Sequence, residues 1–326
     1  MITVVGSTTL DILVGRIPRT PEREGDEFTT SSLVFTESPT RHLLGGNGGN
    51  SAYCLAQLGR EAHLSSAVGT DLAADVLLDW LADADVHLEG IVQTEEFATS
   101  STTVVTDQDS NRLSYHHHGA TGAFSFADLD RSVLRASDAL LVTGPSLLSG
   151  WRMEGIRSAI LAARDADVLT ALDVGPAIGE PVTLDEFGSW LSDVDLLIAN
   201  AHEVTTCAGL TDLQLAADAM AGAGADRVIV KRGSEGASAF VRHATTGDAA
   251  TRIDVGVEAV AADHTVGAGD SFNAGLLHAY LATGDLRDAL EFGARYAARV
   301  LEGGRGTLEA ASIGTLDPED PEAITS

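Results

Sequence analysis

Short apolar runs alternate along the chain with amphipathic stretches that have the spacing of helices. The apolar runs DALLVTG, VLTALDV, DLLIAN and RVIVKRG are separated by helical stretches such as GIRSAILAARDA and LQLAADAMAGAG. Strands that alternate with helices form a parallel sheet whose two faces are covered by those helices. The pattern therefore predicts a mostly parallel three-layer α/β/α sheet, in which ligands bind at the carboxyl ends of the strands.

The same alternation continues toward both ends of the chain. Residues 2–14 predict one buried strand with a polar end, and NGGNSAYCLAQLG and DLAADVLLDWLADA predict helices. EGASAFVR and ATRIDV predict a short antiparallel continuation of the sheet, followed by helices from about 268 to 302. The acidic segment after 306 lacks a clear period and predicts a poorly ordered tail.

Two segments depart from this alternation. Residues 15–43 carry three prolines and a β-rich patch, FTTSSLVFT, whereas residues 99–119 contain TSSTTVVTD and NRLSYHHH joined by the turn DQDSN. The second segment predicts a hairpin, and we expect it to pair with the first as a small β-sheet lid, or clasp. The predicted main domain then comprises residues 1–14, 44–98 and 120–326.

The charge balance of the chain indicates which partners and which environment to expect. The 326 residues, 44% of them hydrophobic, can bury a full core, and the formal net charge is −28 with Lys231 as the one lysine. Such a surface repels polyanions, so we expect no nucleic-acid partner. Acidic, lysine-poor surfaces are typical of proteins that work in concentrated salt, where the repulsion is screened, and we therefore expect a halophilic source.

Other global features indicate a soluble cytoplasmic protein. Cys54 and Cys207 are too few for a disulfide framework and lie in apolar helical patterns, so we expect two buried thiols. The chain begins directly with a predicted strand, and no apolar run approaches the roughly 18 residues of a membrane helix. We therefore expect no membrane partner.

The strongest chemical signal is HTVGAGDSFNAGLLHAYLATG, at residues 264–284. Glycines on both sides of Ala268 allow a tight turn, and the N–H groups at the start of the following helix bind anions. One interpretation makes Asp270 a helix N-cap. In the other, Asp270 accepts the proton of an attacking hydroxyl while the amides of Gly267–Gly269 hold the transferring phosphoryl group.

A second glycine-dense segment, GGNGGNSAYCLAQLG, occupies residues 45–59. It matches neither the GxxxxGK[ST] phosphate loop nor GxGxxG, so generic nucleotide motifs do not explain it. One interpretation is a loop in which Asn47 or Asn50 caps the next helix. In the other, Gly46 lets a polyhydroxy ligand approach the backbone, while the asparagine amides bind its hydroxyl groups.

Together the two segments resemble the signature regions of the ribokinase-like, or PfkB-type, carbohydrate kinase family. The resemblance extends in family order to Asp11 after the first strand, to NAHE at 200–203 and to KRGSEGA at 231–237, so that it spans most of the chain. It implies an ATP-dependent kinase with an alcohol group as acceptor. A set of sites in family order is more specific than any single glycine cluster.

The resemblance also implies a role for each matching residue. Asp270 matches the catalytic base, with Gly267, Ala268 and Gly269 as its anion hole. The substrate site matches Asp11, Gly46, Asn47 and Asn50. The nucleotide site matches Asn200, Lys231, Gly233, Ser234 and Gly236. Glu203, in the N-x-x-E element, matches the residue that organises Mg²⁺ through water, and the lid matches a β-clasp that forms a dimer interface in many members.

Physical chemistry agrees with these roles without requiring them. Asn200 and Glu203 follow the apolar strand DLLIAN, so both would emerge at its carboxyl end, where hard Mg²⁺ accepts oxygen ligands. Glu203 is equally suited to the first turn of a helix. Gly233 and Gly236 are equally typical of an ordinary hairpin between two strands.

The sequence departs from the family pattern at two positions. Members commonly place Asp six residues before the base to help hold an activating monovalent cation, but this chain has His264 there, with Asp263 one position earlier. Activation by potassium therefore stays open. Many ribose-specific relatives have Asn two residues before the first-strand Asp, where this chain has Thr9, so ribose itself is not indicated.

Charged residues of the predicted lid have competing explanations. His116, His117 and His118 cannot all bind one metal ion, because consecutive strand residues face opposite ways, and we expect them on the lid surface. A first hypothesis for the lid arginines, Arg16, Arg41 and Arg112, is that they recognise a phosphate or carboxylate on the substrate. A solvated face is the other.

The first functional hypothesis is a kinase that acts on a small-molecule sugar or sugar-like alcohol. The alternatives are a nucleoside kinase, for which Tyr115 and Phe35 are the candidate aromatics that would stack on a base, and a non-catalytic sugar- or nucleotide-binding regulator. A dinucleotide-dependent oxidoreductase is disfavoured, because no GxGxxG follows the first strand. The exposed strand edges of the lid favour a homodimer.

Overall fold

The computed structural model describes residues 1–22, 25–108, 112–176, 180–242, 250–262, 264–314 and 316–318. Nine strands form the main sheet, in the order β13-β12-β11-β10-β9-β8-β1-β4-β5. These strands are β1 (Ile2–Val5), β4 (Ala62–Val68), β5 (Ile91–Gln93), β8 (Ala139–Thr143), β9 (Leu169–Asp173), β10 (Leu196–Asn200), β11 (Arg227–Lys231), β12 (Ala237–Val241) and β13 (Thr251–Val255). Neighbours from β11 to β5 are parallel, whereas β12 and β13 continue the sheet antiparallel. The predicted mostly parallel sheet is confirmed.

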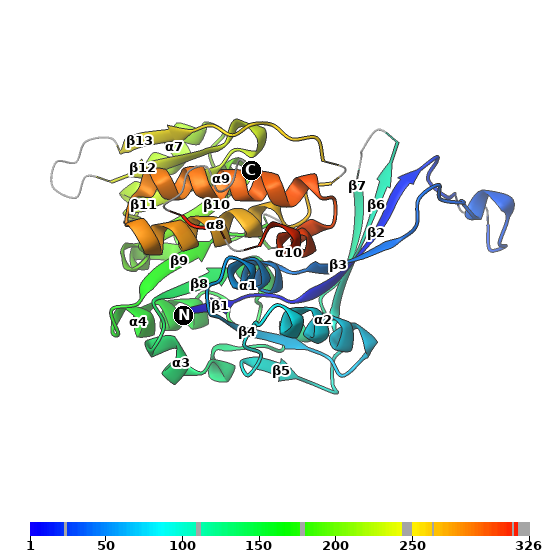
Figure 1. The fold of residues 1–326 in the computed structure, drawn as a ribbon, viewed down its shortest axis with the longest axis horizontal. Helices are drawn as coiled ribbons and strands as arrows, with labels where there is room; N and C mark the ends of the chain where they lie inside the picture. The colour runs from blue at the N-terminus through cyan, green and yellow to red at the C-terminus, as the bar shows by residue number, and fades with distance from the viewer. Residues whose placement is uncertain are drawn as a thin grey trace.

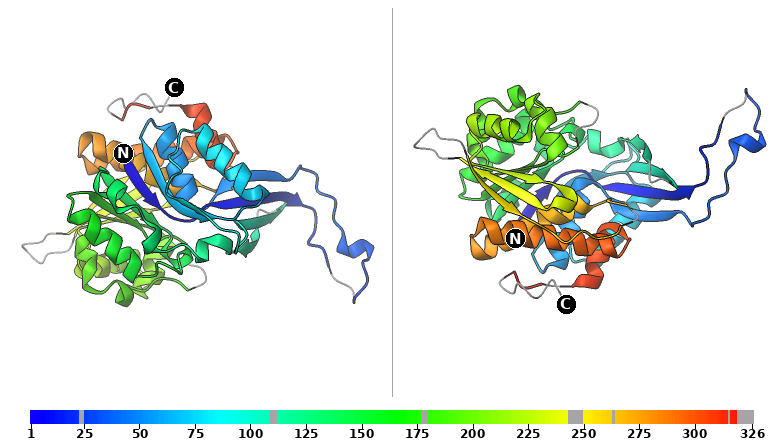
Figure 2. Two further views of the ribbon diagram at one scale, coloured as in Figure 1. Left: turned by 90° about the horizontal axis from the view of Figure 1, so that it is seen from below. Right: turned by 90° about the horizontal axis from the view of Figure 1, so that it is seen from above.

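Helices cover both faces of this sheet, as Figure 2 shows. One face carries α1 (Asn47–Gln57), α2 (Leu72–Asp83), α8 (Ala268–Thr283) and α9 (Leu286–Glu302). The other carries α4 (Glu154–Arg164), α6 (Ala201–Ala208) and α7 (Leu213–Gly222), and the short α3 (Arg131–Arg135) and α5 (Leu184–Phe187) complete the helices before α6. Side chains alternate between the two cores along a strand: Leu197 of β10 packs on one side and Ile198 on the other.

A smaller, four-stranded sheet has the order β3-β2-β6-β7. It consists of β2 (Thr9–Ile17), β3 (Arg41–Gly45), β6 (Ser100–Asp107) and β7 (Arg112–His117). Figure 1 shows it projecting from the main body, with the segment between β2 and β3 extending beyond its far end. The hairpin predicted over residues 99–119 is confirmed. Its parallel contact with β2 involves residues 9–14, and Ile17 is the one described residue of segment 15–43 that pairs with it in register.

The prediction of one strand over residues 2–14 is wrong, because the segment forms β1 in the main sheet and β2 in the smaller one. The chain changes sheets around Gly6, where the backbone passes close to Gly48 of α1: a Cβ added to Gly48 would lie 2.6 Å from the carbonyl carbon of Gly6. The smaller sheet therefore includes residues 9–14 and 44–45, which the sequence pattern assigns to the main domain.

Two further expectations are wrong. The β-rich patch FTTSSLVFT contains only a 3₁₀ turn, Thr30–Ser32, because it lies beyond the sheet, where β-forming residues find no strand to pair with. The expected poorly ordered tail is wrong for 306–313, where the chain forms the 3₁₀ turn Gly306–Glu309 and α10 (Ala310–Ile313) with Thr307 and Ala310 buried; residues 319–326 of that tail lie outside the described residues. Both predicted thiols, Cys54 and Cys207, are buried and free. Within the described residues, no helix has the length and apolar character required to cross a bilayer.

We predict that Gly48→Ala lowers the free energy of unfolding by about 1–3 kcal/mol, because the new methyl group would press on the backbone of Gly6. Urea unfolding at constant salt concentration measures the change. The matched control is Gly222→Ala at the end of α7, where a Cβ meets nothing within 4 Å and the free energy of unfolding should stay level or rise. Equal effects of the two substitutions would contradict this account of the sheet crossover.

Candidate active site

The carboxylate of Asp270 lies at the start of α8, where the backbone is folded by a glycine. Gly267 precedes the helix with φ 81°, in the left-handed region, and a Cβ there would lie 2.5 Å from Cγ2 of Thr307. The Asp270 carboxylate accepts hydrogen bonds from Nδ2 of Asn47, at 3.0 Å, and Nδ2 of Asn50, at 2.9 Å. It is therefore held by side chains of α1 and is not the N-cap of its own helix.

Burial determines the protonation of this carboxyl group. The side chain is buried, and burial raises the pKa of Asp270 to about 7. The hydrogen bond from Asn50 opposes this rise in pKa, the nearby charge of Asp173 adds to it, and Lys231 and Asn47 oppose it. A carboxyl group that titrates near neutral pH is suited to accept a proton from an alcohol.

The first turn of α8 also offers N–H groups to a ligand. In the described part of the chain, the backbone N–H groups of Gly269 and Asp270 have no hydrogen-bond acceptor, whereas that of Ala268 donates to the Thr265 carbonyl at 3.3 Å. Lys231 approaches the same turn, because a Cβ on Gly269 would lie 3.3 Å from its Nζ. An anion at this place would meet both helix-terminal amides and an ammonium group.

A buried network holds the single lysine in position. Lys231 Nζ lies 3.1 Å from Oδ1 of Asp173 and 3.3 Å from Oδ1 of Asn273. The other carboxylate oxygen of Asp173 accepts from Nδ2 of Asn273, at 2.7 Å, and from Oγ1 of Thr143, at 3.1 Å. Burial alone would lower the pKa of Lys231, but the charges of Asp173, Glu203 and Asp270 raise it, so the ammonium stays charged.

Asn200 and Glu203 form a reciprocal capping box at the start of α6. The side chain of Asn200 accepts from the Glu203 N–H at 2.8 Å, and Oε2 of Glu203 accepts from the Asn200 N–H at 2.7 Å. Both residues line the cavity described below. Burial raises the pKa of Glu203 to about 7, Lys231 opposes the rise and Asp173 adds to it. Glu203 therefore caps the first turn of α6, and it also lines the cavity.

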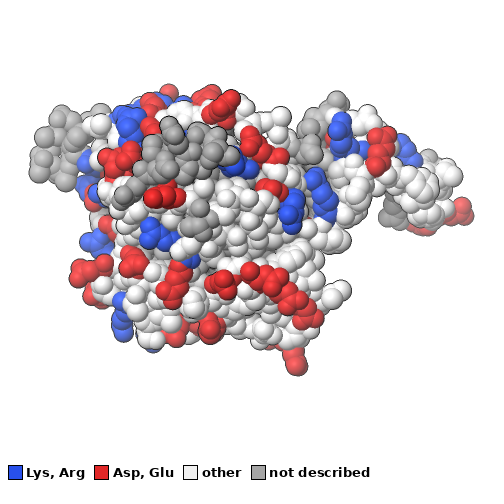
Figure 3. All heavy atoms as spheres, in the orientation of Figure 1, with Lys and Arg blue, Asp and Glu red and all other residues white. Residues whose placement is uncertain are grey.

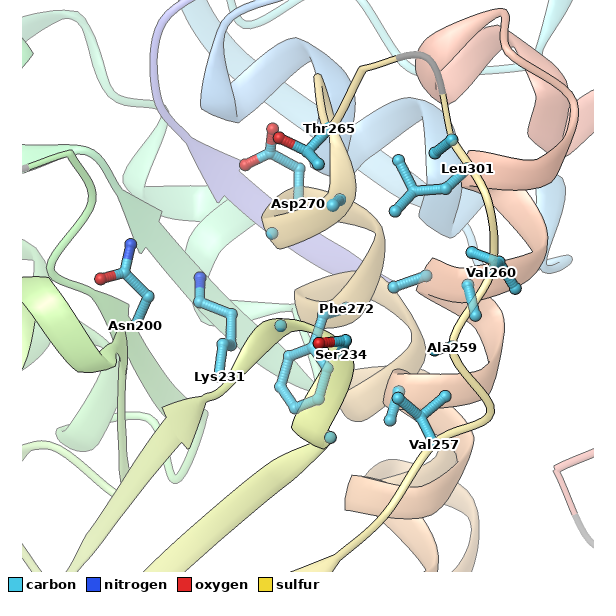
Figure 4. Close-up of a pocket in the computed structure, with 18 of the residues that line it drawn as sticks. Asn200, Lys231, Ser234, Val257, Ala259, Val260, Thr265, Asp270, Phe272 and Leu301 are labelled. Atoms are coloured by element: carbon cyan, nitrogen blue, oxygen red, sulfur yellow. The ribbon is translucent and has the colours of Figure 1, made fainter. Parts of the chain in front are cut away.

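One cavity of about 580 Å³ brings most of the predicted residues together. The predicted residues that line it are Asn47, Asn200, Glu203, Lys231, Gly233, Ser234, Gly236, Ala268, Gly269 and Asp270. Figure 4 shows Asp270, Lys231 and Asn200 at one end and the apolar Val257, Val260 and Leu301 along the opposite wall. The cavity is thus polar where α8 begins and apolar beside the segment before it.

The turn that contains Gly233, Ser234 and Gly236 joins β11 to β12 as an antiparallel hairpin. Gly236 has φ 86°, and a Cβ there would lie 2.2 Å from the carbonyl oxygen of Val255, so only glycine fits. Ser234 lines the cavity at this turn (Figure 4). The hairpin therefore forms one wall of the cavity.

The remaining predicted residues lie outside that cavity. Asn50 contacts Asp270 directly, but Asp11 lies on β2 of the smaller sheet, where burial raises the pKa of its carboxyl group to about 7 against an opposing hydrogen bond from Thr102. Gly46 has φ 79° and packs against the Ser7 carbonyl, which also accepts the N–H groups of Gly48 and Gly49. The glycines of this segment thus serve backbone packing, and neither Asn47 nor Asn50 is a helix cap.

Sequence reasoning missed three residues of the site. Asp173 ends a buried parallel strand, and a carboxylate at that position is a signal that the sequence offers. Asn273 lies one helical turn after Asp270 and shares its face of α8. Thr307 donates from Oγ1 to Oδ1 of Asn50 at 2.6 Å, and no pattern in the sequence of the C-terminal segment indicates this contact.

The histidines and candidate metal ligands lie as follows. Nε2 of buried His264 contacts the Gly304 carbonyl at 3.0 Å, and its Nδ1 accepts from the Val266 N–H at 3.3 Å; Asp263 is outside the described residues. His116 bonds Thr102 through Nδ1 at 3.1 Å, within the smaller sheet. The described residues contain no group of three or more His, Cys, Asp or Glu side chains arranged to hold a metal ion directly.

A buried carboxylate beside unpaired helix-terminal N–H groups and an ammonium group, at the carboxyl ends of parallel strands, is typical of a phosphotransferase. The model of the pfkB family carbohydrate kinases matches residues 7–309, and the chain belongs to this family. Membership confirms the predicted family and the predicted class of enzyme, an ATP-dependent kinase that phosphorylates an alcohol group.

Relatives and solved structures agree with this assignment. The chain is 29% identical over 309 residues to an ATP-dependent ribose-1-phosphate kinase of Halopiger xanaduensis, covering 92% of this chain and 93% of the relative. It is 26% identical over 279 residues to a nucleoside kinase of Methanothermobacter thermautotrophicus, covering 85% and 84%. Arabidopsis thaliana ribokinase, solved with ribose and ATP, has the same fold with a TM-score of 0.76 at 23% identity, covering 99% of this chain and 97% of that one.

We predict that Thr307→Val raises the pKa of Asp270. Loss of the hydroxyl removes the contact that fixes the Asn50 amide, and the hydrogen bond from Asn50 is one of the interactions that keep this pKa down. ¹³C NMR of carboxyl-labelled aspartate, with the resonance assigned by Asp270→Asn, measures the titration. Thr307→Ser retains the donor and should titrate like the parent; an unchanged titration in Thr307→Val would contradict the proposed role of Thr307.

Proposed function

We propose that this chain transfers the γ-phosphoryl group of ATP to a hydroxyl group of a sugar or sugar-like substrate, with Asp270 as the catalytic base. One observation carries the proposal: the Asp270 carboxylate lies beside two N–H groups that have no acceptor in the described part of the chain, in a cavity that also contains Lys231. A proton acceptor next to donors for a phosphoryl group is the arrangement that in-line transfer requires.

The lining of this cavity is suited to a nucleotide, because one wall is apolar and the end near α8 is polar. Val257, Val260, Phe272 and Leu301 supply apolar wall for a purine ring, and the hairpin at Gly233–Gly236 borders it. Phosphates that extend from there toward α8 reach Lys231 and the free N–H groups of Gly269 and Asp270. We assign Asn200 to the same nucleotide path, since it lines the cavity beside Lys231.

Mg²⁺ fits the donor set at the polar end of this cavity. Glu203 lines it with a carboxylate that uses Oε2 for the Asn200 N–H, and Asp173 lines it beside Lys231. Oxygen donors of this kind hold hydrated Mg²⁺ partly through water, so few direct protein ligands are needed. When bound, the ion neutralises charge on the phosphates.

The proposed reaction step uses residues already in place. Asp270 accepts the proton of the substrate hydroxyl, the oxygen forms a bond to the γ-phosphorus, and the bond from that phosphorus to the β-phosphate oxygen breaks to release ADP. The N–H groups of Gly269 and Asp270, in the turn that begins with the predicted anion hole Gly267–Gly269, stabilise the negative charge on the transferring phosphoryl group together with Lys231. Asn47 and Asn50 orient the carboxylate, and we assign them, with Asp11 and Gly46, to the substrate side of the site.

A nucleoside substrate is the second candidate, because two relatives are named nucleoside kinases. The two aromatic residues that would stack on a base do not favour a nucleoside substrate. Phe35 is 83% exposed in the segment between β2 and β3, and Tyr115 is 67% exposed on β7. A non-catalytic regulator is a weaker candidate, since a buried carboxylate beside a phosphate site has no use in simple binding.

We further propose a cytoplasmic enzyme of a salt-rich cell, as the formal charge of −28 and the Halopiger relative suggest.

The smaller sheet corresponds to the predicted lid. Exposed apolar side chains on this sheet and on the segment between β2 and β3 favour a homodimer formed through the lid. Phe28, Phe35, Leu33, Leu113 and Tyr115 are all exposed, and β7 is an edge strand. Apolar side chains beside an open strand edge are usually covered by another chain. The charge of each monomer is screened in concentrated salt, which permits such an association.

We predict that Asp270→Asn lowers kcat by at least about 10³-fold, because an amide cannot accept the proton. In the parent enzyme, the Asp270 carboxyl is protonated below its pKa of about 7, so kcat/KM should fall with decreasing pH below that value and level off above it. A coupled ADP-release assay in molar KCl measures both. Retention of the parental rate in Asp270→Asn, with an unchanged thermal midpoint, would remove Asp270 from the reaction.

We predict that the protein sediments as a dimer of its 33.8 kDa chain, and that Tyr115→Asp converts it to a monomer by placing a charge on the exposed face of β7. Sedimentation equilibrium in molar KCl distinguishes the two states. Leu215→Asp is the control, since Leu215 is 59% exposed on α7 of the main domain and should leave the dimer intact. A dimer that persists in Tyr115→Asp would place the interface elsewhere.

A further inference from the structure

A second cavity, of about 390 Å³, lies between the smaller sheet and the segment that precedes α8. Its wall includes Arg16 and Arg41, and we call it the Arg16–Arg41 cavity. Ala262 lines both this cavity and the one that contains Asp270, so the two adjoin. The phosphoryl transfer described above makes no use of the Arg16–Arg41 cavity.

A β-bulge places Arg16 in this wall. The register between β2 and β6 shifts between Val14 and Ile17, and Arg16 has φ 53°, in the left-handed region. Its backbone N–H donates to Oγ1 of Thr106 at 3.3 Å. A left-handed conformation costs a non-glycine residue about 1–2 kcal/mol, and bulges commonly redirect a side chain beside an active site. The strained backbone conformation therefore occurs at a residue that lines a cavity.

Arg41 is held in the same wall by a specific contact. Its Nη1 donates to the carbonyl oxygen of Gly304 at 2.7 Å, and across the described residues no other bond engages its guanidinium group. His264 also lines the cavity, but its Nε2 contacts the same carbonyl and its Nδ1 accepts from Val266, so both ring nitrogens are engaged. The two guanidinium groups are thus the cationic donors that a ligand would meet in this lining, with the Asp107 carboxylate in the same wall.

The pairing of β2 with β3 relates this cavity to the substrate side of the site. Asp11 and Leu13 lie on one face of β2, two residues and roughly 7 Å apart, and Leu13 is paired with Arg41. A ligand on this face would therefore have Asp11 at one end and the arginines at the other. That separation is comparable to the length of a five-carbon sugar with one substituent.

We propose that the Arg16–Arg41 cavity binds a phosphate group that the sugar substrate already carries. The proposal rests on the proposed kinase function and specifies its substrate class as a sugar phosphate. Planar guanidinium groups bind phosphate through paired N–H donors. Two arginines also offset the repulsion that a chain of formal charge −28 exerts on an anionic substrate.

The surface charge agrees with this assignment. Figure 3 shows basic side chains gathered where the smaller sheet leaves the main body, whereas acidic side chains predominate along the lower part of the same face. A local basic group on an acidic protein concentrates anions at that place. The approach to the Arg16–Arg41 cavity is therefore less repulsive to a sugar phosphate than the rest of this face.

The test compares ribose 1-phosphate, ribose and adenosine as acceptors, in the intact protein at one fixed KCl concentration. We expect kcat/KM for ribose 1-phosphate to exceed that for ribose at least tenfold in the parent. Arg16→Gly should raise KM for ribose 1-phosphate at least tenfold and leave KM for ribose unchanged. Glycine accepts the left-handed backbone at position 16, so this variant keeps its fold.

Arg135→Ala is the matched control, since Arg135 is an exposed arginine of α3 and its loss should change neither constant. Equal use of ribose and ribose 1-phosphate by the parent, or an unchanged KM in Arg16→Gly, would overturn the phosphate subsite while leaving the kinase function intact. Absence of ADP release with all three acceptors would instead contradict kinase activity toward ribose, ribose 1-phosphate and adenosine. In that case the thermal midpoint of unfolding, measured with and without ribose 1-phosphate, tests the phosphate subsite. A midpoint that rises in the parent but not in Arg16→Gly supports the subsite, and a midpoint that does not rise in the parent rejects it.

Discussion

The site depends on keeping one carboxylate, Asp270, buried and still able to ionise. Burial alone would hold it protonated, and the two amide donors of Asn47 and Asn50, with the nearby ammonium of Lys231, bring its pKa back to about 7. Removal of any of these partners leaves either an uncompensated charge or a neutral acid. The arrangement therefore explains why residues from distant parts of the chain converge on the first turn of α8.

The fold supplies that convergence through the carboxyl ends of parallel strands. β9 ends in Asp173, β10 in Asn200 and β11 in Lys231, and these strands are neighbours in the sheet. α1 and α8 pack on the same face of that sheet, which brings the asparagines of one against the aspartate of the other. Thr307 closes the arrangement from the C-terminal segment by fixing the Asn50 amide.

The sequence predicted the elements that repeat and missed those that depend on a single contact. Period and alternation were sufficient for the parallel sheet, its helices and the hairpin over 99–119, and the glycine-rich turns located Asp270 and Asn50. The division of residues 2–14 between two sheets was not visible, because it follows from the approach of Gly6 to Gly48 in space. The contact of Thr307 with Asn50 likewise joins two segments that carry no shared local pattern.

The mutual position of Asp270 and the acceptor alcohol is the central claim, and a crystal structure with a non-hydrolysable ATP analogue, Mg²⁺ and a turned-over substrate measures it directly. We expect one Asp270 carboxylate oxygen about 2.6–3.2 Å from the acceptor hydroxyl, with the terminal phosphate on the amides of Gly269 and Asp270. A complex in which the acceptor alcohol lies out of hydrogen-bonding reach of Asp270, or the phosphate away from those amides, would contradict the account.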